Sequence, residues 1–166
     1  SGPNVMLGYY NNEKETNGAL HIHDDGNVWL HSGDLGVMDK NGFIKYTGRV
    51  KRLIVTSGYN VYPVQIEEVL EKHPAVMLSS VVGIPHPYKQ EVPKAFIVLN
   101  KGYRETEELV KELKELCSKN LPRYAKVYEY EFRKSLPRTM VGKVDFRKLQ
   151  EENNKLRREE RGKEKI

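Results

Sequence analysis

One lysine of this sequence lies on a loop that could carry it to a reacting phosphate. The loop begins at Pro137 and ends with Gly142 and Lys143. Because Pro137 fixes one backbone angle and Gly142 tolerates positive φ, the chain can turn sharply beside a flexible side chain with a strongly hydrated ammonium group. Taken alone, such a lysine is more typical of an ordinary exposed turn, so its function depends on the rest of the chain.

A cluster of histidine and aspartate side chains could also attract a metal ion. His21 and His23 alternate on a predicted strand and would share one of its faces, and Asp24 and Asp25 follow them. No further ligands with a convincing spacing accompany them, and an exposed strand and turn explain the cluster better. We therefore predict no metal site, and we see no arrangement typical of a Ser-His-Asp or Cys-His nucleophile.

The composition is that of a folded, soluble protein. The chain has 166 residues, 38% of them hydrophobic, and its longest apolar runs fall far short of the roughly 20 residues that cross a bilayer. Its single cysteine, Cys117, cannot form an internal disulfide and falls on the apolar face of a predicted helix. We therefore expect a cytoplasmic protein with no transmembrane segment.

The basic charge of the chain does not indicate nucleic-acid binding. The formal net charge is +5, from 28 basic and 23 acidic residues, and much of the excess lies near the C-terminus, interleaved with acidic residues. Mixed charge is typical of a solvated helix or a frayed tail, and no nucleic-acid-binding motif accompanies it. We predict a charged helical extension or tail over residues 151–166.

The first 48 residues predict short strands and turns without a helix. Strand character in residues 19–23 and 28–31 is followed by a hairpin over residues 35–46, whose turn contains Asn41-Gly42. These strands are too few to fold alone, and they would expose an apolar face and unpaired edges. We therefore assign residues 1–48 to the end of a larger domain.

From residue 49 the pattern changes to mixed α and β, and we place a domain boundary there. A strand over residues 52–56 leads to a turn over residues 57–60, and Pro63 then opens a helix whose apolar residues fall on one face. The change in pattern marks the start of a second domain.

Two predicted strands come next, over residues 76–84 and 92–99, and both are rich in β-branched residues. The segment Pro85-His86-Pro87 between them has too many prolines to be helical or to lie within a sheet. Thr106 can then cap a second helix, which we expect to stop before Leu121-Pro122.

The lysine loop is predicted to lie between a last strand and a last helix. The strand covers residues 126–132, and Asp145 can cap the helix while Val144 and Leu149 stand at hydrophobic-staple positions. The order of elements predicts an α+β domain over residues 49–150, in which helices cover a small sheet.

Four blocks of the sequence resemble the adenylate-forming acyl-CoA synthetases, in the AMP-dependent synthetase and ligase family. These blocks are Ser32 to Gly36, Gly48 to Lys51, Ser57 to Glu67 and Leu136 to Lys143. Residues 2–10 are also similar to the stretch that leads into the end of the family's large N-terminal domain. The resemblance covers nearly the whole chain, is strongest to the fatty acid-CoA ligases, and implies the family's mobile C-terminal domain.

The resemblance implies a reaction in two steps, with ATP and CoA as substrates. Family members join a carboxylate to the adenylyl group of ATP and release pyrophosphate, and the small domain then rotates so that the sulfur of CoA attacks the acyl carbon. In the first step two anions must approach each other, and a lysine between them stabilises the transition state more than the separated reactants. We expect Lys143 to have this catalytic role.

The resemblance also assigns ATP or AMP contacts to Asp34 and Arg49. A carboxylate with two acceptor oxygens suits the vicinal diol of a ribose, and a guanidinium presents five donors in a planar fork. The alternatives are a turn aspartate that accepts hydrogen bonds from nearby backbone N–H groups, and an exposed ion-pair partner. Ser32 stands where the family often has threonine.

Lys51 falls where the family has its hinge, and Ser57, Gly58 and Tyr59 fall in the block that approaches CoA. At a hinge the backbone rotates, and the side chain need do no chemistry. Gly58 has no Cβ and could let the chain pass close to the pantetheine thiol, although a simple turn glycine is the alternative.

Several parts of the family's active site are not visible in this sequence. It shows no serine-, threonine- and glycine-rich phosphate loop that ends in lysine, no acyl pocket and no acidic Mg²⁺ ligand. We therefore expect Mg²⁺ to bind the complete enzyme outside this chain, and the partner of the chain to be the missing N-terminal adenylation domain. Alone, the chain should not form an acyl-adenylate.

As part of a longer chain, the expected function is that of an AMP-forming acid-thiol ligase. Medium- or long-chain fatty acids fit best as substrates, but aryl-acid ligases and peptide-synthetase-type adenylation domains carry similar blocks, and the latter deliver the acyl group to a carrier-protein thiol. A non-catalytic binding or interaction module with this fold is a further alternative.

Overall fold

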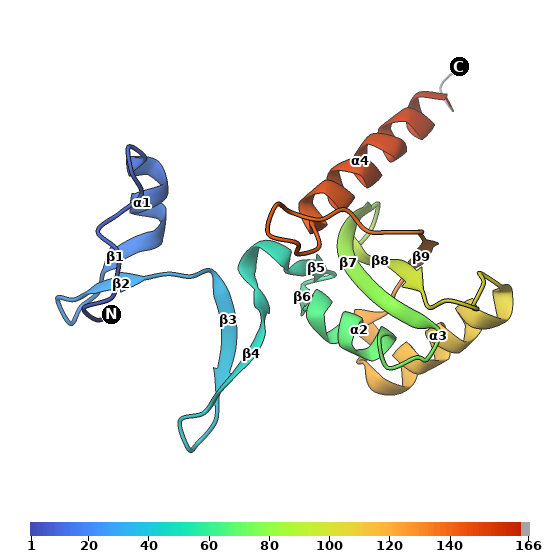
Figure 1. The fold of residues 1–166 in the computed structure, drawn as a ribbon, viewed down its shortest axis with the longest axis horizontal. Helices are drawn as coiled ribbons and strands as arrows, with labels where there is room; N and C mark the ends of the chain where they lie inside the picture. Colours follow the sequence, from blue (N-terminus) through green and yellow to red (C-terminus); the bar gives the residue numbers. More distant parts are fainter. Residues whose placement is uncertain (164–166) are drawn as a thin grey trace. The chain divides into compact units, whose positions relative to one another are not determined.

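The computed structural model describes residues 1–163, which form two compact units (Figure 1). The first unit runs from Ser1 to Lys51, and the second begins at Arg52. None of the helices within the described residues combines the length and the apolar character that a membrane crossing requires.

The first unit contains two antiparallel strand pairs. Its strands are β1 (Leu20–Ile22), β2 (Val28–Leu30), β3 (Asp34–Met38) and β4 (Ile44–Arg49). Strand β1 pairs with β2, and β3 pairs with β4. The carboxylate of Asp39 closes the second hairpin by accepting hydrogen bonds from the backbone N–H groups of Asn41 and Phe43, and Gly42 takes a φ of 85°. The predicted hairpin is therefore confirmed.

The prediction that this segment contains no helix was wrong. Helix α1 (Glu13–Ala19) precedes β1, and the side chain of Asn12 caps it by accepting a hydrogen bond from the backbone N–H of Glu15 at 3.1 Å. Glu13 and Glu15 lie in the first turn, where the helix dipole favours negative charge. An asparagine followed by acidic residues was the local signal for this helix.

The first unit leaves its apolar strand residues exposed. All the buried hydrophobic residues of the described chain lie at Ile54 or later. The exposed ones on or beside the strands of the first unit are Ile22, Val28, Trp29, Leu30, Val37, Met38, Phe43, Ile44 and Tyr46. The exposed apolar surface that the sequence predicts for these strands is therefore present.

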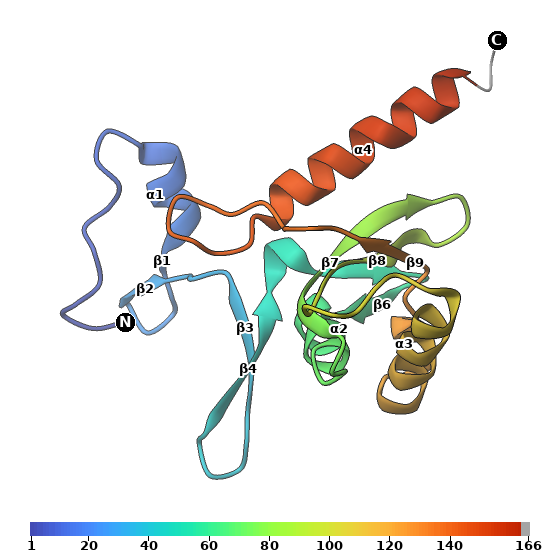
Figure 2. The ribbon, with the colours of Figure 1, turned by 45° about the vertical axis from the view of Figure 1, so that its right-hand side comes forward.

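The second unit is built on a five-stranded mixed sheet (Figure 2). Its strands are β5 (Ile54–Thr56), β6 (Tyr59–Val61), β7 (Val76–His86), β8 (Gln90–Leu99) and β9 (Glu129–Phe132). Their order is β6, β5, β8, β7, and β9 pairs in parallel with β8. Two short 3-10 helices, η1 (Val50–Arg52) and η2 (Arg123–Ala125), precede β5 and β9.

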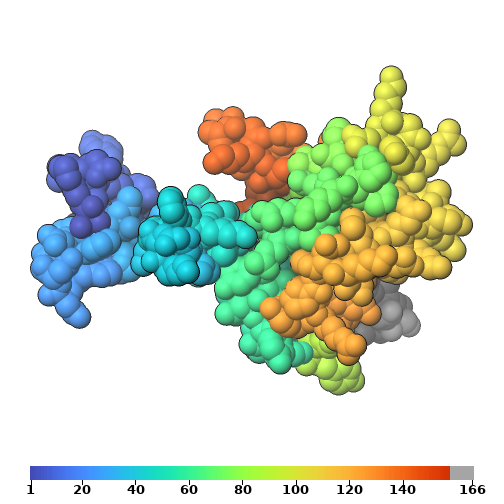
Figure 3. Space-filling view, turned by 90° about the horizontal axis from the view of Figure 1, so that it is seen from below, coloured from blue at the N-terminus to red at the C-terminus, as the bar shows by residue number. Residues whose placement is uncertain are grey.

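Helices cover both faces of this sheet. Helices α2 (Pro63–Leu70) and α3 (Glu107–Asn120) lie on one face, which Figure 3 views, and α4 (Phe146–Lys163) lies on the other. Residues of β8 alternate between the layers, since Ala95 and Ile97 join the α2–α3 core whereas Phe96 and Val98 join the α4 core. The predicted α+β fold class is confirmed.

Short-range signals located the starts of α3 and α4 correctly. Thr106 caps α3 by accepting a hydrogen bond from the backbone N–H of Leu109 at 3.1 Å. At the start of α4, Asp145 accepts one from the backbone N–H of Lys148 at 3.2 Å. Helix α4 continues through most of the charged segment, and residues 164–166 of the predicted extension lie outside the described residues.

The expectation that the proline-rich segment interrupts the sheet was wrong. Pro85 and His86 extend β7 and pair with Glu91 and Gln90 of β8. An antiparallel ladder alternates hydrogen-bonded and non-hydrogen-bonded pairs, so a residue without an N–H fits at alternate positions. Pro93 lies within β8 for the same reason.

Candidate functional site

The loop that carries Lys143 is closed by its own backbone. The N–H of Thr139 donates to the carbonyl of Lys143 at 2.7 Å, and the N–H of Gly142 donates to the carbonyl of Thr139 at 2.9 Å. At the base, the N–H of Asp145 donates to the carbonyl of Pro137 at 2.8 Å. Gly142 has a φ of 81°, which glycine adopts without strain, so the predicted sharp turn is present.

The tip of this loop is open to a ligand. The guanidinium of Arg138 braces the turn by donating to the carbonyl of Gly142 at 2.7 Å. Lys143, Met140 and Val141 are exposed, and none of the ion pairs among the described side chains of residues 1–157 involves Lys143. A fixed backbone thus presents a free ammonium group.

Asp34 and Arg49 face each other across the β3–β4 pair. The Nε of Arg49 lies 2.8 Å from the Oδ1 of Asp34, and both side chains stay accessible, with exposed fractions of 56% for Arg49 and 36% for Asp34. Ser32 accepts a hydrogen bond from the backbone N–H of Asp34 at 3.2 Å. Adjacent carboxylate and guanidinium groups can bind hydroxyl groups and an anion side by side.

Lys51 is the last residue of the first compact unit, and its side chain is exposed. Arg52, the next residue, is held in place within the second unit. Its guanidinium pairs with the carboxylate of Glu67 and donates to the carbonyl of Val81 at 3.3 Å. It also lies over the ring of Phe146, 5.0 Å from the centroid. The side-chain contacts of Arg52 therefore anchor the chain directly after Lys51.

Ser57, Gly58 and Tyr59 form the tip of the β5–β6 hairpin. Ser57 and Gly58 have φ values of 50° and 83°, as a two-residue hairpin turn requires. A Cβ at Gly58 would meet open space, so the backbone conformation rather than crowding favours glycine there. The turn is shorter than the predicted one, because Tyr59 and Asn60 pair with β5.

Aromatic and basic side chains that the sequence did not single out surround this tip. The ring of Tyr59 stacks on Tyr124 with a centroid distance of 4.8 Å and an interplanar angle of 6°. The N–H of Ser57 donates to the carbonyl of Lys89 at 3.1 Å, and the ammonium of Lys89 donates to the hydroxyl of Tyr128 at 2.5 Å. Only the pairing of distant segments brings these residues together, so no local signal could have identified them.

Three histidines gather on the β1–β2 pair. The Nε2 atoms of His23 and His31 lie 2.8 Å apart, and the ring centroids of His21 and His31 lie 4.4 Å apart. Desolvation lowers the pKa of His31, and the neighbouring His21 and His23 lower it further. Within residues 1–163, no three His, Cys, Asp or Glu side chains form a group that could hold a metal ion.

Part of this chain matches a known protein family. Residues 65–143 match the family described as the AMP-binding enzyme C-terminal domain. The match begins within α2 and ends at Lys143, and it includes α3 and the strands β7, β8 and β9.

Curated acyl-CoA ligases match most of this chain. A long-chain-fatty-acid-CoA ligase of Bacillus subtilis is 44% identical over 151 residues, which make up 91% of this chain and 26% of that protein. A 2-succinylbenzoate-CoA ligase of Bacillus mycoides is 42% identical over 154 residues, with 91% and 30% coverage. The chain therefore spans about a quarter of the length of such relatives.

Solved structures of related enzymes are similar to this chain in both fold and sequence. The ATP-bound crystal structure of MatB from Rhodopseudomonas palustris is 33% identical with a TM-score of 0.78, over 91% of this chain and 29% of that one. The amide bond synthetase McbA from Marinactinospora thermotolerans is 32% identical with a TM-score of 0.75, over 89% and 29%. The resemblance is thereby confirmed: residues 65–143 belong to the AMP-binding enzyme C-terminal domain family, and the chain is similar to the C-terminal part of acyl-CoA ligases.

Proposed function

We propose that this chain works as the C-terminal part of an ATP-dependent acyl-CoA synthetase. Residues 1–48 would complete the large adenylation domain, residues 49–150 would form the mobile domain, and the charged residues from 151 would extend its last helix. The observation that carries the proposal is the lysine loop, whose closed backbone presents an exposed ammonium at the end of the matched domain. The division into compact units beside Lys51 supports it.

Lys143 would act in the first half-reaction, in which a carboxylate oxygen attacks the α-phosphate of ATP and pyrophosphate leaves. Both reactants are anions, and the charge that gathers between them in the transition state is where an ammonium group stabilises most. The triphosphate, the carboxylate and Mg²⁺ would be held by an adenylation domain joined before residue 1. Without that domain the chain would have negligible activity.

Asp34 and Arg49 would contribute the nucleotide contacts of the first unit. The Asp34 carboxylate is positioned to accept hydrogen bonds from the two hydroxyl groups of the ribose, and Arg49, which already pairs with it, is positioned to contact ribose or phosphate. Their mutual ion pair keeps both side chains oriented before the nucleotide arrives.

Lys51 would be the hinge about which the mobile domain turns between the half-reactions. Its place at the edge of the first compact unit supports this role, as does the firmly held Arg52 that follows. A few dihedral angles at such a boundary can rotate a whole domain.

Ser57, Gly58 and Tyr59 would approach CoA in the second half-reaction. The surroundings of the hairpin tip support this assignment, because CoA carries an aromatic base and several phosphates. Stacked tyrosine rings offer a face to the base, and Lys89 offers a positive charge nearby.

A medium- or long-chain fatty acid is the acyl substrate that we propose. The similarity to the fatty acid ligase of Bacillus subtilis supports it, and the 2-succinylbenzoate ligase matches nearly as well. The residues that select the acyl group would then lie in the adenylation domain and not in this chain. A cytoplasmic location is consistent with a lone, buried and unpaired cysteine, Cys117.

Transfer of the acyl group to an amine is a second candidate function. The similarity to an amide bond synthetase favours it, because the first half-reaction can serve either acceptor. The acceptor is then decided in the second half-reaction.

The test uses the intact enzyme, with the adenylation domain joined before residue 1. We expect fatty-acid-dependent exchange of pyrophosphate into ATP, followed by consumption of CoA and appearance of the thioester. Exchange without CoA consumption, but with amide formation on an added amine, would support the second candidate. No exchange with any fatty, aryl or dicarboxylic acid would contradict both and leave a non-catalytic module.

A further inference from the structure

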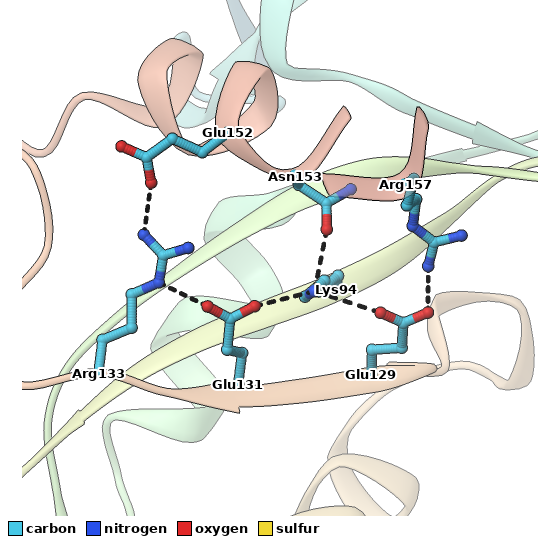
Figure 4. Close-up of polar contacts among 7 residues, drawn as sticks. All are labelled: Lys94, Glu129, Glu131, Arg133, Glu152, Asn153 and Arg157. Carbon is cyan, nitrogen blue, oxygen red and sulfur yellow. Dashed lines mark hydrogen bonds and ion pairs between the residues drawn. The ribbon is translucent and has the colours of Figure 1, made fainter. Parts of the chain in front are cut away.

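A polar network joins the strand that enters the lysine loop to the helix that leaves it (Figure 4). We call it the Lys94 network, and its members are Lys94, Glu129, Glu131, Arg133, Glu152, Asn153 and Arg157. The two glutamates of β9 and the arginine that follows it face three residues of α4, and the lysine of β8 lies between them.

Lys94 is the centre of the network. Its Nζ lies 2.9 Å from Glu131 Oε2 and 3.3 Å from Glu129 Oε2. It also donates to Asn153 Oδ1 at 2.9 Å, so each of its three donors has an acceptor. The Lys94 side chain is only 12% exposed and Asn153 only 2%. A charged group so enclosed is stable only with its hydrogen bonds satisfied, which fixes the geometry around it.

Two arginines complete the connection between sheet and helix. Arg133 lies 2.6 Å from Glu131 and 2.6 Å from Glu152, and Arg157 pairs with Glu129. Burial raises the pKa of Glu131, but hydrogen bonds from Lys94 and Arg133 outweigh it and hold that pKa below its usual value. Glu131 is therefore ionised at neutral pH. Three separate contacts tie α4 to Lys94 of β8, to Glu129 of β9 and to Arg133 beside β9.

We propose that the Lys94 network positions Lys143 for the first half-reaction. The loop's own hydrogen bonds fix its shape, but the strand and helix at its base set the direction in which the lysine points. Helix α4 begins three residues after Lys143, and the network clamps that helix to the entering strand. The inference rests on the function proposed above for Lys143.

A change in the Lys94 network should affect the two half-reactions differently. An ammonium that must lie between a carboxylate and a phosphate tolerates little displacement, and a shift of about 1 Å can reduce a rate about 100-fold. Attack of CoA on a finished acyl-adenylate does not require this lysine. A loosened network should therefore slow adenylation and spare thioester formation.

The test is Lys94→Met in the intact enzyme, because methionine keeps most of the unbranched apolar stem and removes the charge, while Glu129 and Glu131 keep their arginine partners. We expect pyrophosphate exchange to fall about 10- to 100-fold. Thioester formation from supplied acyl-adenylate and CoA should stay within about threefold of the parent. Lys94→Arg, which keeps the positive charge, should retain more exchange activity than Lys94→Met.

Two controls separate the possible failures. Leu113→Ala removes a buried side chain from α3, on the opposite face of the sheet, and should lower the unfolding temperature without separating the half-reactions. Lys143→Ala should separate them completely. If Lys143→Ala does so and Lys94→Met does not, the positioning role is wrong while the proposed function stands. If Lys143→Ala does not, the proposed function fails.

A second variant decides the matter if Lys94→Met does not fold. Glu152→Gln removes the negative charge from the contact between α4 and Arg133, and Glu152 is partly exposed, so the fold should survive. We expect a loss of exchange activity of about threefold to tenfold with unchanged thioester formation. Equal losses in both half-reactions, or no loss in either, would overturn the proposal.

Discussion

The backbone on either side of Lys143 determines how this lysine is presented. Hydrogen bonds from Thr139, Gly142 and Asp145 fix the loop, so the lysine is presented by a rigid turn and only its own four methylenes stay free. Asp34 and Arg49 are likewise held by the backbone. The β3–β4 pair places them opposite each other, with Arg49 Nε 2.8 Å from Asp34 Oδ1. At this scale the proposed chemistry depends on side chains whose backbone is held by hydrogen bonds.

Gly58 should be needed both for the turn and for CoA. Its φ of 83° strains any β-branched residue, so Gly58→Val should lower the free energy of unfolding by about 1–2 kcal/mol. It should also raise the KM for CoA, because a side chain would project from the hairpin tip. Thermal unfolding and steady-state kinetics of the intact enzyme measure the two effects.

Gly102→Val is the matched control for that variant. Gly102 also has positive φ, 97°, and open space around it, but it lies in the loop before α3 and outside the proposed CoA block. It should lose similar stability without any change in the KM for CoA. If both variants raised this KM equally, the CoA assignment of Gly58 would be wrong.

Local residue signals could be read from the sequence, and contacts between distant residues could not. The glycine at position 142 and the caps Thr106 and Asp145 act on their immediate neighbours, so their roles were predictable. The hydrogen bond between Lys89 and Tyr128 depends on how β8 pairs with its neighbouring strands. The residues next to Lys89 and Tyr128 in the sequence give no signal of it.

At the scale of elements, the junction of β8, β9 and α4 matters most. The sequence predicted the last strand and the last helix, but the strand begins later than expected, at Glu129, because residues 126–128 form an irregular connection between η2 and β9. The parallel pairing of β9 with β8 brings its two glutamates to Lys94. A parallel pair between distant segments has no sequence signal comparable to a hairpin turn.

Acid should weaken this junction. The pKa of Glu131 is lower in the folded protein than in the unfolded chain, so its ionised form stabilises the fold at neutral pH. That contribution is complete above the unfolded pKa of about 4 and is lost as the pH falls through the folded value. Thermal unfolding at pH values between about 7 and 3 measures the loss.

Glu131→Gln removes this titration and is the control. The variant should be less stable at neutral pH, and its unfolding temperature should fall less steeply over the acid range. An unchanged acid slope in the variant would show that other carboxylates cause the loss.

At the scale of the molecule, the chain divides after Lys51 into two compact units. The structural division after Lys51 falls close to the change of pattern seen at residue 49, because the β-rich segment and the mixed segment each have their own hydrogen-bonded pairing. The hydrophobic core lies entirely in the second unit. The first unit therefore has exposed apolar strands, which fit the proposal that it completes a larger domain.

The hinge proposal predicts an asymmetric effect at Lys51. Lys51→Pro should leave adenylation within about threefold of the parent and slow thioester formation by at least about tenfold, because proline restricts the backbone rotation. Lys51→Ala, which leaves the backbone free, should preserve both half-reactions. Equal loss of both half-reactions in the proline variant would contradict the hinge assignment.

Lys143→Ala in the intact enzyme tests the central claim most directly, with the exposed Lys134→Ala as its matched control. The two half-reactions are measured separately, as fatty-acid-dependent pyrophosphate exchange and as thioester formation from supplied acyl-adenylate. We expect Lys143→Ala to lose exchange activity by at least about 100-fold and to keep thioester formation, with Lys134→Ala unchanged in both. Undiminished exchange in Lys143→Ala, or an equal fall in both half-reactions, would contradict the account.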